Sequence, residues 1–247
     1  MTEPRILFAG TPEISVPLLR ALNENFNVVG VLTSCDKSVG RSKALVPSPV
    51  KSVALELGIP VLQFDSLRTQ AREEVKKLGA DTLISFAFGK IFGPLFLDLF
   101  PNGRFNVHPS ALPMLRGPSP IQFTILEGLK EATISFQNLG LKMDEGEIWG
   151  TTSFELDGTE TTESLSAIVA AKAAQFVPSL LREVVAGKVE PKAQEGDLGN
   201  SLVSSPCTLA VTVNTAAALR VPASIGTCET GIHSNTEYLV SVALYET

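Results

Sequence analysis

Cysteine is scarce in this sequence of 247 residues, and its placement excludes two kinds of stabilised small fold. The three cysteines, Cys35, Cys207 and Cys228, are odd in number, lie far apart and form no CxxC pair. A disulfide framework and a zinc knuckle both require closely patterned cysteines. We therefore expect neither of them, and we expect no bound metal.

Long apolar runs are missing as well. No uninterrupted apolar run reaches the roughly 18 residues that cross a bilayer. The first residues, MTEPRILFAG, do not contain the basic segment followed by an apolar one that marks a secretory signal. These absences predict a cytoplasmic protein without a membrane partner.

A surplus of positive charge is also absent. The formal net charge is −6, from 20 basic and 26 acidic residues. This balance argues against a broad nucleic-acid surface and confines any contact with RNA to a local patch. Hydrophobic residues make up 44% of the chain, which is enough for one good-sized core or for one domain with a small appendage.

Short apolar runs alternate with helical patterns along the first part of the chain. Four runs have the character of parallel strands buried on both faces: residues 5–9, 28–33, 82–88 and 104–108. Helices are expected between them, over residues 13–26, 48–58 and 66–79. The alternation predicts a doubly wound, Rossmann-like α/β fold whose mostly parallel sheet binds ligands at the carboxyl ends of its strands. No GxGxxG follows the first strand, which argues against a dinucleotide.

The second part of the chain divides into two regions of different composition. The first continues the α/β pattern, with expected helices over 120–128 and 162–185 and expected strands over 132–138 and 147–156. From Leu198 onward, the last fifty residues contain one Arg and three Glu. We therefore expect one domain over residues 1–197 and a short tail over 198–247. The tail is compatible with a few strands or with poor order.

A polar pair stands near the end of the apolar strand expected over 104–108. Asn106 and His108 alternate with apolar residues, so both side chains are expected on the same face, at the ligand-binding edge. An amide beside an imidazole can polarise a carbonyl and stabilise the oxyanion of acyl transfer. Asp144, on a glycine-containing loop between two expected strands, is a candidate third group that orients the imidazole or accepts a proton from an attacking amine.

Simpler interpretations of these residues stay open. An Asn-x-His pair at a strand end also serves as a hydrogen-bonded turn anchor, and Asp-Glu-Gly is a common turn. Arg116, in the loop after the pair, also fits a solvated cation.

The segment NVHPSALPMLRGPSPIQ resembles the signature of the folate-dependent formyltransferases. In that signature an Asn-x-His pair precedes a Ser-Leu-Leu-Pro loop and then an Arg-Gly pair, and here Ala111 replaces the first leucine. The segment MDEGEI is similar to the Asp-x-Gly segment of the same family. The resemblance implies a Rossmann-like formyltransferase domain whose catalytic residues are Asn106, His108 and Asp144.

Two further segments resemble the methionyl-tRNA formyltransferases in particular. They are the opening FAGTPEISVPLLRAL and the basic loop in CDKSVGRSKALVPSPVKSVALELGIPVLQ, which other formyltransferases usually lack. The resemblance runs over about residues 5–197 and implies formyl transfer from 10-formyltetrahydrofolate, as co-substrate, to initiator methionyl-tRNA by a monomer without a metal. The folate-binding residues that it implies are Phe86, Ala87, Phe88, Gly89, Ser110, Ala111, Leu112 and Pro113, and the tRNA-binding residues are Arg41 and Lys43.

The resemblance ends beyond the segment KVEPKAQEGD. Members of the family continue into a small basic β-barrel that helps to hold the tRNA, whereas residues 198–247 lack basic residues interleaved with aromatic ones. Three functions therefore stay open. They are formylation of methionyl-tRNA, formyl transfer to another acceptor such as an amino sugar nucleotide or water, and an inactive relic that binds folate.

Overall fold

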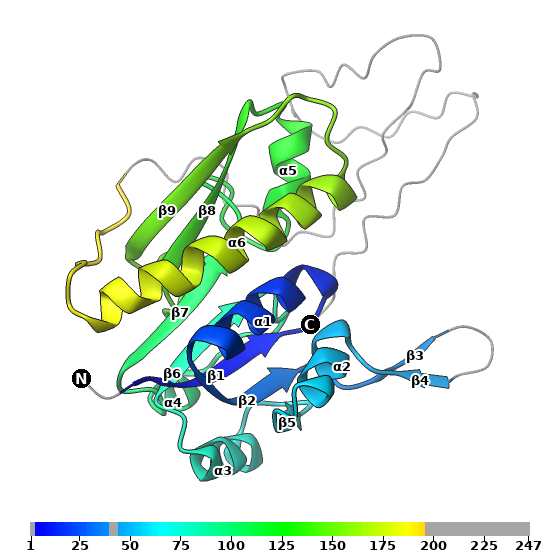
Figure 1. Ribbon diagram of the computed structural model, residues 1–247, viewed down its shortest axis with the longest axis vertical. Helices are drawn as coiled ribbons and strands as arrows, with labels where there is room; N and C mark the ends of the chain where they lie inside the picture. The colour runs from blue at the N-terminus through cyan, green and yellow to red at the C-terminus, as the bar shows by residue number, and fades with distance from the viewer. Residues whose placement is uncertain (1–2, 40–43, 196–247) are drawn as a thin grey trace, which may run out of the picture. The chain divides into compact units, whose positions relative to one another are not determined.

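A seven-stranded sheet forms the centre of the protein (Figure 1). The computed structural model describes residues 3–39 and 44–195. In spatial order the strands are β5 (Val61–Gln63), β2 (Asn27–Thr33), β1 (Arg5–Gly10), β6 (Thr82–Phe86), β7 (Gly103–His108), β8 (Glu131–Asn138) and β9 (Ile148–Glu155). The first five are parallel, and β8 and β9 are antiparallel to their neighbours. The expected doubly wound, mostly parallel sheet is therefore confirmed.

Helices cover both faces of the sheet. They are the 3-10 turn η1 (Glu13–Ser15) and the helices α1 (Val16–Asn25), α2 (Pro49–Glu56), α3 (Thr69–Leu78), α4 (Pro94–Leu97), α5 (Pro120–Leu126) and α6 (Thr162–Val185). Alternate residues of β1 enter two separate cores, because successive side chains of a strand point to opposite faces. Ile6 and Phe8 pack with α1, α2 and α6, whereas Leu7 and Ala9 pack with α3 and α4.

The helix α6 is apolar because it is a core helix. It is the one helix in the described part of the chain whose length and composition would allow it to cross a membrane. Its residues Leu165, Val169, Ala173, Val177 and Leu181 are almost completely buried. Their four-residue spacing places them along one side of the helix, which packs beside α1 and against β8 and β9 (Figure 1).

Several element boundaries differ from those expected. The strand expected over 82–88 ends at Phe86, because Ala87 has a left-handed φ of 49°. The helix expected over 13–26 divides after Ser15, because Pro17 has no N–H with which to continue the hydrogen-bond ladder from η1. The strands β5, β3 (Lys37–Val39) and β4 (Ala44–Val46) and the short helix α4 were not predicted.

The tail lies outside the described residues. Consequently the domain boundary at residue 197, and the choice between strands and poor order for residues 198–247, stay predictions. The same holds for residues 40–43, which β3 and β4 flank as an antiparallel pair.

Ser48 caps α2 and provides a test of local stability. Its hydroxyl accepts a hydrogen bond from the Lys51 backbone N–H at 3.1 Å. We expect Ser48→Ala to lower the free energy of unfolding by about 1 kcal/mol. The measurement is the urea midpoint at an unchanged m-value. Ser52→Ala, at an exposed serine of the same helix, is the control, and an equal loss in both variants would contradict the capping role.

Candidate active site

Two loops meet beside the polar pair of β7, and a third follows the neighbouring strand β6. Residues 87–93 follow β6, residues 109–119 follow β7, and residues 139–147 join β8 to β9. Each loop contains one residue other than glycine with a left-handed φ: Ala87 at 49°, Leu115 at 54° and Asp144 at 53°. Such conformations cost roughly 1–3 kcal/mol each and cluster at functional sites. The three left-handed residues therefore point to the same region of the fold as Asn106 and His108 do in the sequence.

A polar patch lies on one face of β7 and β8. The register pairs Asn106 with Gln137 and His108 with Ser135, so the four side chains share one face. Three of them are buried: His108 is 5% exposed, Gln137 1% and Ser135 0%. The apolar residues between them belong to the hydrophobic core on the other face. A buried polar patch of this size requires hydrogen-bond partners, and these come from the loops.

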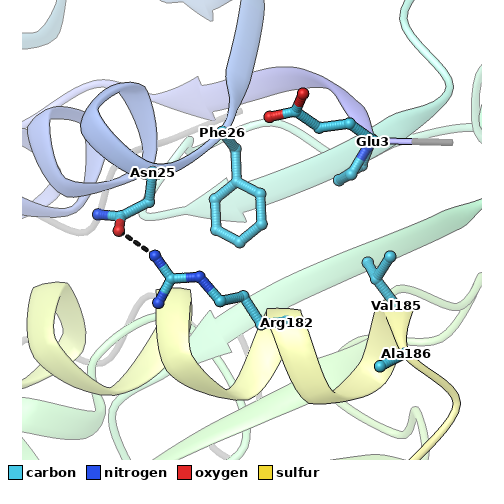
Figure 2. A pocket seen from close by; sticks show the side chains of 7 residues that line it. Glu3, Asn25, Phe26, Arg182, Val185 and Ala186 are labelled. Atoms are coloured by element: carbon cyan, nitrogen blue, oxygen red, sulfur yellow. Dashed lines mark hydrogen bonds between the residues drawn. The ribbon is translucent and has the colours of Figure 1, made fainter.

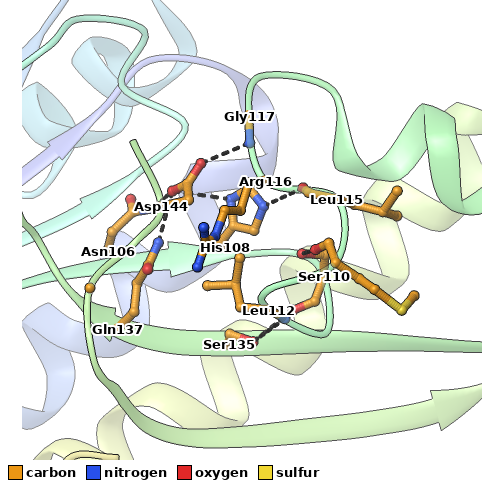
Figure 3. A network of polar contacts seen from close by, with 12 residues as sticks. Asn106, His108, Ser110, Leu112, Leu115, Arg116, Gly117, Ser135, Gln137 and Asp144 are labelled. Carbon is orange, nitrogen blue, oxygen red and sulfur yellow. Dashed lines mark hydrogen bonds and ion pairs between the residues drawn. The ribbon is translucent and has the colours of Figure 1, made fainter. Parts of the chain in front are cut away.

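Asp144 lies at the centre of this patch (Figure 3). Its Oδ1 accepts a hydrogen bond from Gln137 Nε2 at 2.8 Å, and its Oδ2 accepts one from the Gly117 backbone N–H at 2.9 Å. The other two contacts of Oδ1 are longer, at 3.4 Å to Asn106 Nδ2 and 3.6 Å to His108 Nδ1. The two short bonds therefore fix the carboxylate, while the long contacts leave Asn106, and His108 when its ring carries both protons, able to donate to another oxygen.

The imidazole of His108 is held on its opposite side. Its Nε2 lies 2.9 Å from the carbonyl oxygen of Leu115. A carbonyl oxygen only accepts hydrogen bonds, so Nε2 carries a proton in this arrangement. As a result, Nδ1 is the nitrogen that faces Asp144 and the space beside Asn106.

The sequence prediction thus placed Asn106, His108 and Asp144 in one site, and the structure brings all three side chains together. The sequence prediction did not include Gln137, Arg116 or Gln194 among the site residues. The alternation of Ser135 and Gln137 within an apolar strand was a usable signal for Gln137. The interpretation of Arg116 as a solvated cation was wrong, because the residue is 9% exposed and donates to Gln194 Oε1 from Nε at 3.0 Å.

In both expected folate-binding segments, buried residues alternate with more exposed ones. Phe86 and Phe88 point into the cores, and Ala87 and Gly89 between and after them are exposed. In the second segment Ser110 and Leu112 are buried, Ala111 is exposed and Pro113 is half-buried. The Ser110 hydroxyl donates to the Met114 carbonyl at 2.6 Å, and the Ser135 hydroxyl donates to the Ser110 carbonyl at 2.6 Å (Figure 3). These bonds fix the shape of the loop.

The expected tRNA-binding residues, Arg41 and Lys43, lie outside the described residues. The segment before the β3–β4 hairpin is anchored by Lys51, whose Nζ lies 2.6 Å from Asp36 Oδ2 and 2.8 Å from Gln63 Oε1. Hydrogen bonds from Lys51 and then from Gln63 hold the pKa of the Asp36 carboxyl below its ordinary value. Lys51 is therefore engaged in supporting the hairpin.

A second concave region lies between the ends of α1 and α6 (Figure 2). This depression of about 330 Å³ is lined by Glu3, Pro4, Asn25, Phe26, Arg182, Val185 and Ala186. Arg182 donates to Asn25 Oδ1, and its guanidinium lies 5.7 Å from the centre of the Phe26 ring. The depression shares no residue with the polar patch. Within the described ranges, no group of three His, Cys, Asp or Glu side chains is placed to hold a metal ion.

Comparison with known proteins defines the class of protein. The chain belongs to the formyl transferase family, whose model matches residues 5–181. It is 39% identical over 193 residues to the methionyl-tRNA formyltransferase of Bacillus subtilis. The aligned region covers 77% of this chain and 61% of that protein. It is 42% identical over 199 residues to the methionyl-tRNA formyltransferase of Treponema pallidum, and this aligned region covers 77% of this chain and 62% of that protein. The chain therefore spans about three fifths of the length of these curated relatives.

Solved structures show the same fold at lower identity. Glycinamide ribonucleotide transformylase 1 from Symbiobacterium toebii gives a TM-score of 0.64 at 19% identity, over 78% of this chain and 95% of that one. WlaRD, a sugar 3N-formyl transferase solved in the presence of dTDP and 5-N-formyl-THF, gives a TM-score of 0.60 at 18% identity. The match covers 81% of this chain and 69% of that one. The expected formyltransferase fold and the resemblance to methionyl-tRNA formyltransferases are confirmed.

Proposed function

We propose that this protein transfers a formyl group from 10-formyltetrahydrofolate to the α-amine of initiator methionyl-tRNA, giving formylmethionyl-tRNA for translation initiation. The observation that carries this proposal is the arrangement around Asp144. Its carboxylate is fixed by Gln137 and Gly117, and the loosely engaged donors Asn106 and His108 lie beside it. Two donors and a fixed base are the groups that acyl transfer to an amine requires.

The reaction proceeds through a tetrahedral intermediate. The amine nitrogen attacks the formyl carbon, and the formyl oxygen becomes an oxyanion that accepts hydrogen bonds from Asn106 Nδ2 and from His108 Nδ1. Because Nε2 of His108 already donates to the Leu115 carbonyl, Nδ1 donates only when the ring is a doubly protonated imidazolium. Asp144 accepts the proton that the amine loses. The oxyanion then reforms the carbonyl as the bond from the formyl carbon to N10 breaks, and N10 takes the proton held by Asp144 and leaves as tetrahydrofolate. The step needs neither a metal nor a covalent enzyme intermediate.

The substrates are assigned from the loops and from the family. The formyl-folate lies along the backbones of residues 86–89 and 110–113, which border the polar patch. The acceptor stem contacts the hairpin that contains Arg41 and Lys43, as a local basic patch on an acidic protein. We further propose that the protein acts in the cytoplasm, where translation initiates, and that it acts as a monomer.

A formyl-folate enzyme with a different acceptor is the second candidate. The fold neighbours include a sugar 3N-formyl transferase, and the chain covers about three fifths of its methionyl-tRNA formyltransferase relatives. In this case the chemistry at Asn106, His108 and Asp144 is the same, and the amine comes from a smaller molecule such as an amino sugar nucleotide.

An acid gel of initiator methionyl-tRNA, incubated with purified protein and 10-formyltetrahydrofolate, tests the proposal. Release of tetrahydrofolate is followed by absorbance, with and without the tRNA. We expect formylmethionyl-tRNA and tetrahydrofolate to appear in equal amounts. Release of tetrahydrofolate without a formylated tRNA would move the acceptor to another amine or to water, and no product of either kind would indicate an inactive folate-binding relic.

A further inference from the structure

Gln194 connects the segment that follows α6 to the loops around Asp144. The segment lies beside the start of β9, where Lys192 and Ile148 exchange two backbone hydrogen bonds of 2.8 and 2.9 Å. Two residues later the chain places Gln194, which is half-buried, against the polar patch. A residue about 50 positions away in sequence thus contacts the loop that contains the proposed base.

Both ends of the Gln194 amide are engaged. Its Nε2 donates to the backbone carbonyl of Asp144 at 2.8 Å and to that of Gly146 at 2.7 Å. Its Oε1 accepts from the guanidinium of Arg116, from Nε at 3.0 Å and from Nη2 at 2.5 Å. One side chain therefore joins the 139–147 loop to the 109–119 loop.

The bond to the Asp144 carbonyl has a particular consequence. Asp144 has a φ of 53°, which is unfavourable for a residue with a Cβ and persists only where surrounding contacts hold it. The side-chain bonds from Gln137 and Gly117 fix the carboxylate, and the Gln194 amide fixes the carbonyl of the same residue. Without this amide, the peptide after Asp144 is free to rotate, and the carboxylate turns with it.

We propose that Gln194 is a positioning residue for formyl transfer, acting through Asp144. The inference rests on the proposed function, and it assigns a role to the segment between α6 and residue 196. The important part of the side chain is its donor end, since the acceptor end serves Arg116. Substitution by alanine removes both the donor that binds the two carbonyls and the acceptor that binds Arg116, so a second variant that keeps the acceptor is needed to separate these roles.

Three variants of the full chain test the proposal: Gln194→Ala, Gln194→Glu and Glu195→Ala. We expect Gln194→Ala to lower kcat by about tenfold with a smaller change in KM, because the bonds from Gln137 and Gly117 keep the carboxylate in the site but position it less precisely without support for the backbone. Gln194→Glu keeps an acceptor for Arg116 but cannot donate to the two carbonyls, so we expect a loss at least as large. Glu195→Ala, at the exposed next residue, should retain the wild-type kcat.

The outcomes separate the alternatives. Full activity in Gln194→Glu would overturn the donor role and reduce Gln194 to a partner for Arg116. A rise in KM at unchanged kcat in both Gln194 variants would also overturn it.

If the wild-type protein does not formylate methionyl-tRNA, the proposed function fails. The positioning role is then tested by nitrogen NMR of the imidazole of His108, one of two histidines in the chain. Unchanged His108 signals in Gln194→Ala would contradict the inference, and shifts absent from Glu195→Ala would support it.

Discussion

Replacing His108 by alanine is expected to lower the rate of formyl transfer by about 10²–10⁴-fold, the usual contribution of a positioned donor or proton carrier. The ring is buried and held between the Leu115 carbonyl and the Asp144 carboxylate. In the proposed reaction Nδ1 of the doubly protonated ring donates to an oxygen that becomes negative only in the transition state. Its loss should therefore lower the rate of the bound complex and leave the affinity for formyl-folate almost unchanged.

Single-turnover kinetics separate these two effects. The rate is measured with the methionyl-tRNA complex at saturating 10-formyltetrahydrofolate, and binding is measured by titration with 5-formyltetrahydrofolate, which serves as an unreactive probe. His233→Ala is the matched control, because His233 is the other histidine of the chain and lies beyond the residues that match the family. Weak binding of the probe combined with a normal rate for the bound complex would show that His108 supports the pocket and not the transition state.

Much of this site was predictable from the sequence because it depends on a strand. A continuous apolar run identifies a buried strand, and alternation then places Asn106 and His108 on one face. The four strands of the central parallel region were found in this way, although the end of β6 at Phe86 was not. The left-handed Ala87 that ends it carries no signal in the sequence, since alanine, unlike glycine or asparagine, is not a residue that favours a positive φ.

The rest of the site depends on contacts that have no periodic pattern. Strands of three residues such as β5 are too short to show alternation, so the pattern gave no evidence for them. Gln194 lies in a segment without helical or strand pattern, and its role arises from two carbonyls and a guanidinium that the fold brings to it. The role of Arg116 stayed open for the same reason, because a loop position alone does not reveal burial.

Gly146→Ala is expected to lower formyl transfer by about 10²-fold, because a displacement of roughly 1 Å at a catalytic group has an effect of that size. A Cβ at Gly146 would lie 1.8 Å from the backbone oxygen of Asn138 and 2.7 Å from its carbonyl carbon. Asn138 cannot move easily, because it is the last residue of β8 and pairs with Phe105 of β7. The 139–147 loop must therefore shift and take Asp144 with it.

The same loop supplies the control. A Cβ at Gly140 would meet its nearest neighbours, the backbone atoms of Lys142, only at 4.0 Å, so Gly140→Ala should keep nearly the wild-type rate. Both variants exchange the same residue types a few positions apart, and urea midpoints show whether the sheet remains intact in each. If Gly146→Ala reacts as fast as Gly140→Ala, the reaction does not depend on where the loop holds Asp144. In that case the carboxylate cannot be the base that accepts the proton of the amine, whereas a selective loss at Gly146 ties the rate to the position of this loop.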